Sequence, residues 1–233
     1  MSIAEKLALI AENIPKVYEA GKQAGGDNPI YYAMKFTGLF SSATFPENYD
    51  FVLNVKKAPT DMSNMFMTAT GLKTVKLISE DNTNDIIYQA CFRDNKTLET
   101  VDLTEYNRKP TTVAYMFLGA SALKSVYGAL DFTNCTNTTI WLNGAYLLED
   151  IEFVPNTINI TIPFQWCTKL TKASITSAIN GLNADVTGQT VTFNKYAVNN
   201  AFGINVDDES TYTDEFNTLR QSRSNWTFAY AIG

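Results

Sequence analysis

The chain has 233 residues, of which 45% are hydrophobic and 18% charged, and its formal net charge is −6 at pH 7. Such a chain can bury a core, but its acidic balance argues against binding nucleic acid or adhering to an anionic membrane, since both use clustered Lys and Arg. Because the sequence contains no histidine, it excludes Ser-His-Asp and Cys-His catalysis and His-ligated zinc.

The N-terminal segment carries apolar residues at helical spacing. They recur three and four positions apart, at Ile3, Leu7, Ile10, Ile14 and Val17. Two interpretations stay open. The helix packs on the unit that follows, as a short helical cap within residues 1–47, or it forms a coiled coil that makes homo-oligomers through residues 3–20. Pro15 should kink or end this helix.

No segment indicates export or membrane insertion. The apolar run that begins at Leu7 is shorter than the core of a signal peptide, and no later run reaches the ~18 apolar residues of a membrane span. We therefore expect a soluble chain that is cytoplasmic as synthesised, which is compatible with later association with a virion or a bacterial surface.

Residues 48–176 contain an internal repeat. The repeated motif begins with an aromatic residue or leucine. A leucine follows after five intervening residues, and a valine or isoleucine follows after two more. The leucines recur every 22 to 26 residues. Two-residue alternation places the valine and the apolar residue two positions later on one face of a strand, and stacked copies bury that face. The copies are Phe66…Leu72…Val75, Phe92…Leu98…Val101, Phe117…Leu123…Val126, Leu142…Leu148…Ile151 and a weaker Phe164…Leu170…Ala173.

The repeat predicts a β-rich solenoid, a coil of about five repeats. In the third copy, Gly128 stands where the apolar residue beyond the valine is expected. Leu130 or Phe132 can fill that space instead.

One part of the repeat resembles a known family. The segment TDMSNMF at residues 60–66 leads into LKTVKL at residues 72–77, and Met116, Phe117 and Leu123 follow the same pattern. It resembles the BspA-like leucine-rich repeats of bacterial surface and phage-associated proteins, which read Met-x-x-Met-Phe and then Leu-x-x-Leu-x-Leu. The resemblance implies a right-handed leucine-rich-repeat solenoid with a ladder of short strands, and it implies no chemistry.

Residues 177–233 are predicted to form an α+β cap at the C-terminal end, because a solenoid needs a terminal unit with a polar outer face. The expected elements are a short helix at 175–182, a strand at 190–194, a helix at 214–223 and a final strand at 226–230.

Residues beside the buried valines should point outward and line up across the repeats, since neighbouring strands lie about 4.7–4.9 Å apart. They form what we call the polar strip, in two columns: Thr74, Thr100, Ser125, Asp150, Lys172 and Lys76, Asp102, Tyr127, Glu152, Ser174. The strip is either a surface that binds an extended partner or an ordinary solvated face. Tyr127 stands out, because an exposed tyrosine can stack on a sugar ring or anchor a protein interface.

Part of the strip is acidic, at Asp102, Asp150 and Glu152, with Glu99 and Glu149 beside it. Stacked carboxylates can hold Ca²⁺ or form the carboxylate pair of a glycosidase, but neither pattern is specific here. We therefore expect no metal, no cofactor and no catalytic residue.

The cysteines lie far apart in the sequence and are predicted to be buried thiols. They are Cys91, Cys135 and Cys167.

The sequence thus favours a non-enzymatic binding or structural module that presents the polar strip to a glycan or a protein, in a phage tail or on a bacterial surface. One alternative is a glycan depolymerase that uses Asp102 and Glu152. Another is a spacer protein that oligomerises through its N-terminal helix. A nucleic-acid partner is not expected.

Overall fold

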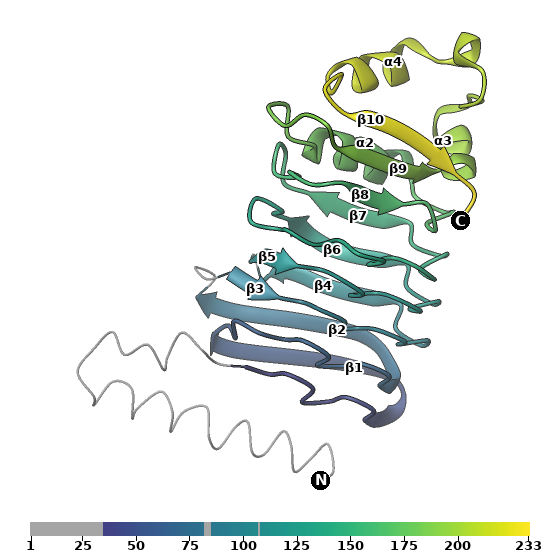
Figure 1. Cartoon of the computed structure of the whole chain (residues 1–233). Coiled ribbons are helices and arrows are strands. Elements are labelled where there is room, and N and C mark those ends of the chain that lie inside the picture. Colours follow the sequence, from purple (N-terminus) through teal and green to yellow (C-terminus); the bar gives the residue numbers. More distant parts are fainter. Residues whose placement is uncertain (1–34, 82–84, 107) are drawn as a thin grey trace.

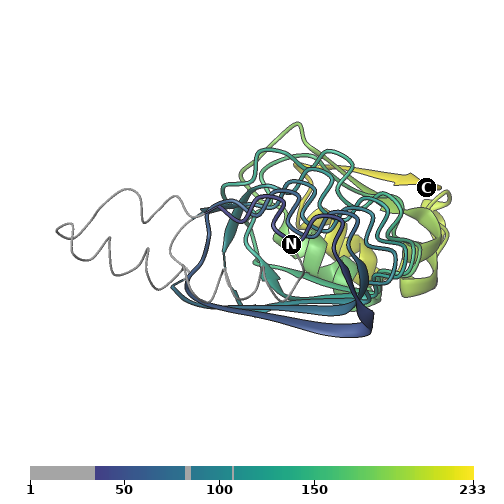
Figure 2. The same ribbon diagram turned by 90° about the horizontal axis from the view of Figure 1, so that it is seen from below.

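The computed structural model describes residues 35–81, 85–106 and 108–233, apart from the side chains of residues 56, 57 and 81. They form a β-solenoid of about six turns, built mostly of parallel strands. The strands lie one above another from β1 toward β10 (Figure 1), and the turns overlie one another when the stack is viewed from below (Figure 2). The predicted β-rich solenoid is therefore confirmed. The predicted N-terminal helix and the oligomerising segment 3–20 lie outside the described residues.

The main sheet has five strands in the order β1-β2-β4-β6-β7, and all four pairs are parallel. Parallel pairing follows from the repeat, since each copy crosses the sheet once in the same direction before the coil returns. The strands are β1 (Thr44–Lys57), β2 (Thr70–Asp81), β4 (Thr100–Glu105), β6 (Ser125–Leu130) and β7 (Asp150–Phe153).

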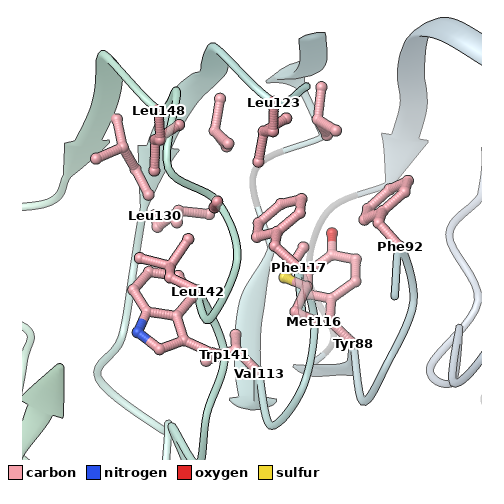
Figure 3. Packing of buried hydrophobic residues seen from close by; sticks show 14 of the residues in the cluster. Tyr88, Phe92, Val113, Met116, Phe117, Leu123, Leu130, Trp141, Leu142 and Leu148 are labelled. Carbon is pink, nitrogen blue, oxygen red and sulfur yellow. The ribbon is translucent and has the colours of Figure 1, made fainter. Parts of the chain in front are cut away.

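The four leucines of the repeat are fully buried and lie in line, because each stands two residues before a set of strand positions that pair with one another. They are Leu72, Leu98, Leu123 and Leu148. Figure 3 shows Leu123 and Leu148 along the same side of the core. The Thr171 amide donates to the Glu149 carbonyl at 3.0 Å, so Leu170 continues the line. Leu130 or Phe132 was expected to replace the apolar residue missing at Gly128. Both are buried, and Leu130 pairs with Phe153, the apolar residue of the fourth copy.

The repeated phenylalanines form a column of stacked rings beside the leucines. Phe92 lies 5.5 Å from Phe66 at an interplanar angle of 5° and 5.5 Å from Phe117 at 9° (Figure 3). Phe40 extends the column by one ring, 5.4 Å from Phe66. The fifth copy was expected to continue the repeat, but Phe164 belongs to a second sheet and stacks on Phe193 at 5.3 Å.

A first turn at Phe40 and β1 precedes the predicted copies. Pro46 stands where its leucine would be, and the pairing of β1 with β2 shifts between Thr44 and Tyr49. This irregularity brings the backbone of β1 close to Gly71, whose φ is +82°.

The coil that returns the chain between strands uses left-handed backbone at two positions in each of five turns, four residues apart. At eight of these ten positions the amide donates to a carbonyl of the next turn, as from Asn64 to Gln89 at 2.9 Å and from Thr68 to Arg93 at 2.8 Å. These inter-turn bonds hold six non-glycine residues at φ between 51° and 58°. The two columns are Gly38, Asn64, Ala90, Tyr115, Ile140 and Ser42, Thr68, Asp94, Gly119, Gly144.

Replacement of Ile140 by glycine is expected to stabilise the protein. Ile140 has a φ of 50° and an exposed side chain, and left-handed backbone costs a β-branched residue about 1–2 kcal/mol. The added entropy of glycine in the unfolded chain offsets about half of this gain. Thermal unfolding should shift upward by about 2 °C. Ile140→Ala keeps the strained backbone and should show no rise; equal gains in both variants would contradict this account.

A second sheet covers the opposite side of the C-terminal turns, in the order β10-β9-β8. Its strands are β8 (Ile162–Phe164), β9 (Thr190–Asn194) and β10 (Thr227–Ala231), and a short pair, β3 (Asp85–Ile87) and β5 (Lys109–Thr112), lies among the earlier turns. The helices are α2 (Lys172–Gly181), α3 (Lys195–Phe202), the 3-10 helix η2 (Glu209–Thr211) and α4 (Asp214–Gln221). The four elements predicted beyond residue 174 are therefore present, with small shifts at their ends. Within the described part, no helix is both long and apolar enough to cross a membrane.

Helix α2 lies beside β7 in the place where the fifth copy was expected to supply a strand. It begins at Lys172 because Thr171 is its N-cap, whose side-chain oxygen accepts from the Ser174 amide at 3.3 Å. Two serines of α2 then accept hydrogen bonds from the backbone amides along the free edge of β7. Ser174 Oγ accepts from the Ile151 amide at 3.0 Å, and Ser177 Oγ accepts from the Phe153 amide at 2.9 Å.

Candidate functional site

The polar strip crosses the outer face of the main sheet, and strand pairing brings seven of its ten predicted residues into register. Thr74 pairs with Thr100 and Lys76 with Asp102. Thr100 pairs in turn with Ser125 and Asp102 with Tyr127. Ser125 pairs with Asp150, and Glu152 follows Ile151, the partner of Val126. The first column therefore runs in register across β2, β4, β6 and β7, but its member Ser125 is buried by its neighbours and not exposed as predicted. The second column runs in register across β2, β4 and β6, and the pairing with β7 shifts after Val126.

The last two predicted strip residues do not continue the columns, because both belong to α2. Lys172 forms an ion pair with Glu215 and lies 5.2 Å from the centre of the Phe202 ring. Ser174 is buried, and its hydroxyl is occupied by the Ile151 amide. The prediction of strand positions for Lys172 and Ser174 was wrong, because the Thr171 cap starts a helix where the alternation suggested a strand.

Strand β1 adds residues to the strip that the repeat pattern did not identify. Asp50 pairs with Thr74, and its carboxylate accepts a hydrogen bond from the Thr74 hydroxyl at 2.6 Å. Val52 pairs with Lys76. Val52 is 56% exposed. These positions could have been found only from the in-register pairing, since the first turn lacks the leucine of the repeat.

The middle of the strip holds one lysine paired with two carboxylates. The Lys76 ammonium lies 2.7 Å from a carboxylate oxygen of Glu105 and 3.6 Å from one of Asp102. Burial opposes ionisation of Asp102, but hydrogen bonds from Thr104 and the nearby Lys76 charge outweigh it and lower its pKa. The hydrogen bond to Glu105 raises the pKa of Lys76. These groups therefore stay charged and paired with each other.

The strip ends in a recess of about 290 Å³ where the sheet meets α2. A helix is about 10 Å across, roughly twice the spacing of strands, so a helix in the place of a strand makes a step beside the sheet. The polar side chains around the step are Tyr127, Asp150, Glu152, Ser174 and Ser177. Tyr127 is 48% exposed, and the alternation that predicted its exposure is confirmed.

The carboxylates that sequence analysis singled out are spread over the sheet. Glu99 forms an ion pair with Lys124 at 3.0 Å, and this contact lowers its pKa. Asp102 and Glu152 stand on β4 and β7, with β6 between them. Among the described residues, no group of three or more Cys, Asp or Glu side chains is arranged to hold a metal ion.

The three thiols and the Trp141 indole belong to the core. Cys91, Cys135 and Cys167 are buried and unbridged, as predicted, and burial raises their pKa values. Trp141 is fully buried in the core (Figure 3). Its indole N–H donates to the Pro163 carbonyl at 3.0 Å.

A second recess, of about 370 Å³, lies off the strip, beside Thr68, Asp94 and Lys96. It has no aromatic side chain in its lining, and its two charged residues have opposite signs. The recess at Tyr127 is therefore the stronger candidate for a binding site. The chain matches no protein-family model, no curated protein and no solved structure.

Proposed function

We propose that the protein is a non-enzymatic binding module whose polar strip holds an extended glycan, with the recess at Tyr127 as its anchoring point. The observation that carries the proposal is the in-register polar columns of the main sheet, which lead to a recess with an exposed aromatic ring. Concave sites with one apolar surface and a few polar groups are typical of small-ligand binding.

The composition of the strip supports a glycan over a protein as the ligand. The core of a protein interface is depleted in charged side chains and rich in aromatic ones. The strip instead carries mostly hydroxyls and charged groups, with the exposed Val52 on β1 and one exposed aromatic ring, Tyr127, toward its other end. A sugar chain uses such a surface well, because its hydroxyls pair with polar side chains and its ring faces stack on a tyrosine.

The setting follows from the resemblance to BspA-like leucine-rich repeats, which occur in bacterial surface and phage-associated proteins. The TDMSNMF and LKTVKL segments that carry this resemblance form consecutive parts of one turn, a coil segment and β2. We therefore propose that the ligand is a bacterial surface polysaccharide and that the protein belongs to a phage particle or a cell surface.

The chemistry of the strip favours binding over cleavage. A glycosidase needs a carboxylic acid whose pKa is raised so that it can protonate the leaving group. The pKa of Asp102 is lowered instead, and its two oxygens are occupied by Thr104 and Lys76. Asp102 therefore suits a fixed acceptor better than a proton donor.

Loss of the Tyr127 ring is expected to weaken glycan binding about tenfold, since a stacked anchor side chain contributes more than 1 kcal/mol. The measurement is a titration calorimetry series with the bacterial wall and capsular polysaccharides that the wild-type chain retains on an array. Tyr196→Ala is the matched control, because Tyr196 is 49% exposed but lies on α3. An array that retains nothing, or equal affinity of Tyr127→Ala and wild type, would overturn the proposal.

A further inference from the structure

The recess beside Tyr127 carries negative charge that its own neighbourhood does not neutralise. Asp150 and Glu152 both line it, and neither forms an ion pair with a lysine or arginine of the described residues. The two nearby lysines are engaged elsewhere, because Lys124 pairs with Glu99 and Lys172 with Glu215.

The remaining polar groups orient the Asp150 carboxylate without cancelling its charge. One oxygen lies 3.4 Å from the Ser125 hydroxyl and the other 3.5 Å from the Thr171 hydroxyl, both long for hydrogen bonds. The N-terminus of α2 adds a partial positive charge of roughly half an elementary charge. Two full carboxylate charges exceed that amount, so the recess stays negative and is complementary to a cation.

The Tyr127 ring indicates which kind of cationic ligand fits the recess. An aromatic face attracts an ammonium group and also stacks on the apolar face of a sugar ring. The recess, at about 290 Å³, is at the small end of ligand sites, which suits one sugar residue of a chain better than a folded partner. A ligand with both a cationic group and a ring is therefore the best match.

We propose that the recess selects an amino-sugar residue with a free ammonium group, which binds Asp150 and Glu152 while its sugar ring stacks on Tyr127. This inference rests on the proposed glycan-binding function and makes it specific. N-acetylation removes the charge of the sugar amine, so an acetylated residue leaves both carboxylates without a counter-ion. The recess therefore binds the free-amine form of the sugar more tightly than the N-acetylated form. The rest of the polar strip binds the neighbouring sugars.

The test compares two probes of equal length with the full chain, a β-1,4-linked glucosamine oligosaccharide and its fully N-acetylated counterpart. Titration calorimetry at mildly acidic pH keeps the amines protonated. We expect the free-amine probe to bind about tenfold more tightly. In the double variant Asp150→Asn/Glu152→Gln this preference should fall to nearly equal affinities, while binding of the acetylated probe stays as in wild type.

The control variant is Glu80→Gln/Asp185→Asn, which removes the same net charge from exposed positions outside the recess and should keep the tenfold preference. Equal binding of the two probes by wild type would overturn this inference while leaving the glycan-binding function standing. Loss of the preference in the control variant would also overturn it, because net charge alone would then explain the result. Tighter binding of a lysine-rich peptide than of the amino-sugar probe would assign the recess to a protein ligand instead. Failure of every glycan, including those on the polysaccharide array, would remove both proposals.

Discussion

Replacement of Phe92 by alanine is expected to lower the free energy of unfolding by about 4 kcal/mol. The ring is fully buried and stacks on Phe66 and Phe117, each at 5.5 Å. Alanine leaves a cavity in the middle of the column, and both neighbouring rings lose a stacking partner. Chemical denaturation measures the loss, and hydrogen exchange should show faster opening in the turns on both sides of the substitution.

Phe92→Leu is the matched control. Leu142 occupies the equivalent place in the fourth copy, so leucine at position 92 should cost less than about 1.5 kcal/mol. A similar loss in both variants would show that ring stacking, and not filled volume, dominates at this position. Retention of wild-type stability by Phe92→Ala would contradict the stacked core itself.

Replacement of Gly71 by alanine should destabilise the protein by about 3 kcal/mol. A Cβ at this position would lie 2.2 Å from the carbonyl oxygen of Phe45 and 2.6 Å from that of Pro46, and the φ of +82° adds strain for any L residue. Backbone atoms cannot move aside as a flexible side chain does, so the pairing of β1 with β2 must open. Thermal unfolding and the exchange protection of β1 report this change.

Gly188→Ala separates the two causes. Gly188 has a φ of +73°, but a Cβ there would meet nothing within 4 Å. It should therefore lose only the ~1 kcal/mol that left-handed backbone costs. Equal effects at both glycines would mean that the close approach of β1 contributes nothing.

The periodic part of the fold could be predicted because each copy meets nearly the same environment. Leu72 and Leu98 lie in equivalent surroundings, so the same residue type recurs and the repeat can be recognised from the spacing of its leucines. The first turn escaped detection because Pro46 interrupts the pattern and β1 shifts its register to absorb it. The left-handed backbone at Ala90 and Tyr115 could not be predicted either, since inter-turn hydrogen bonds impose it against the preference of both residues.

The sequence contains a helix-start signal for α2, but the strand-like alternation of apolar residues around it favoured a fifth strand. Thr171 is a favourable N-cap residue, but the apolar residues Leu170 and Ile175 also fit the strand pattern of the earlier copies. The in-register columns of the polar strip could therefore be predicted from alternation alone, as Tyr127 shows. The recess could not, because it depends on a helix beside β7 that the strand pattern did not foresee.

The hydroxyls of Ser174 and Ser177 also bear on the tendency of the protein to aggregate through its sheet edge at high concentration. A parallel sheet whose last strand offers free amide donors recruits strands from other molecules and grows into fibres. Here the donors of Ile151 and Phe153 are taken by serines of the same chain. An incoming strand finds no free amide at those two positions, so we expect this edge of the main sheet not to recruit strands from other molecules.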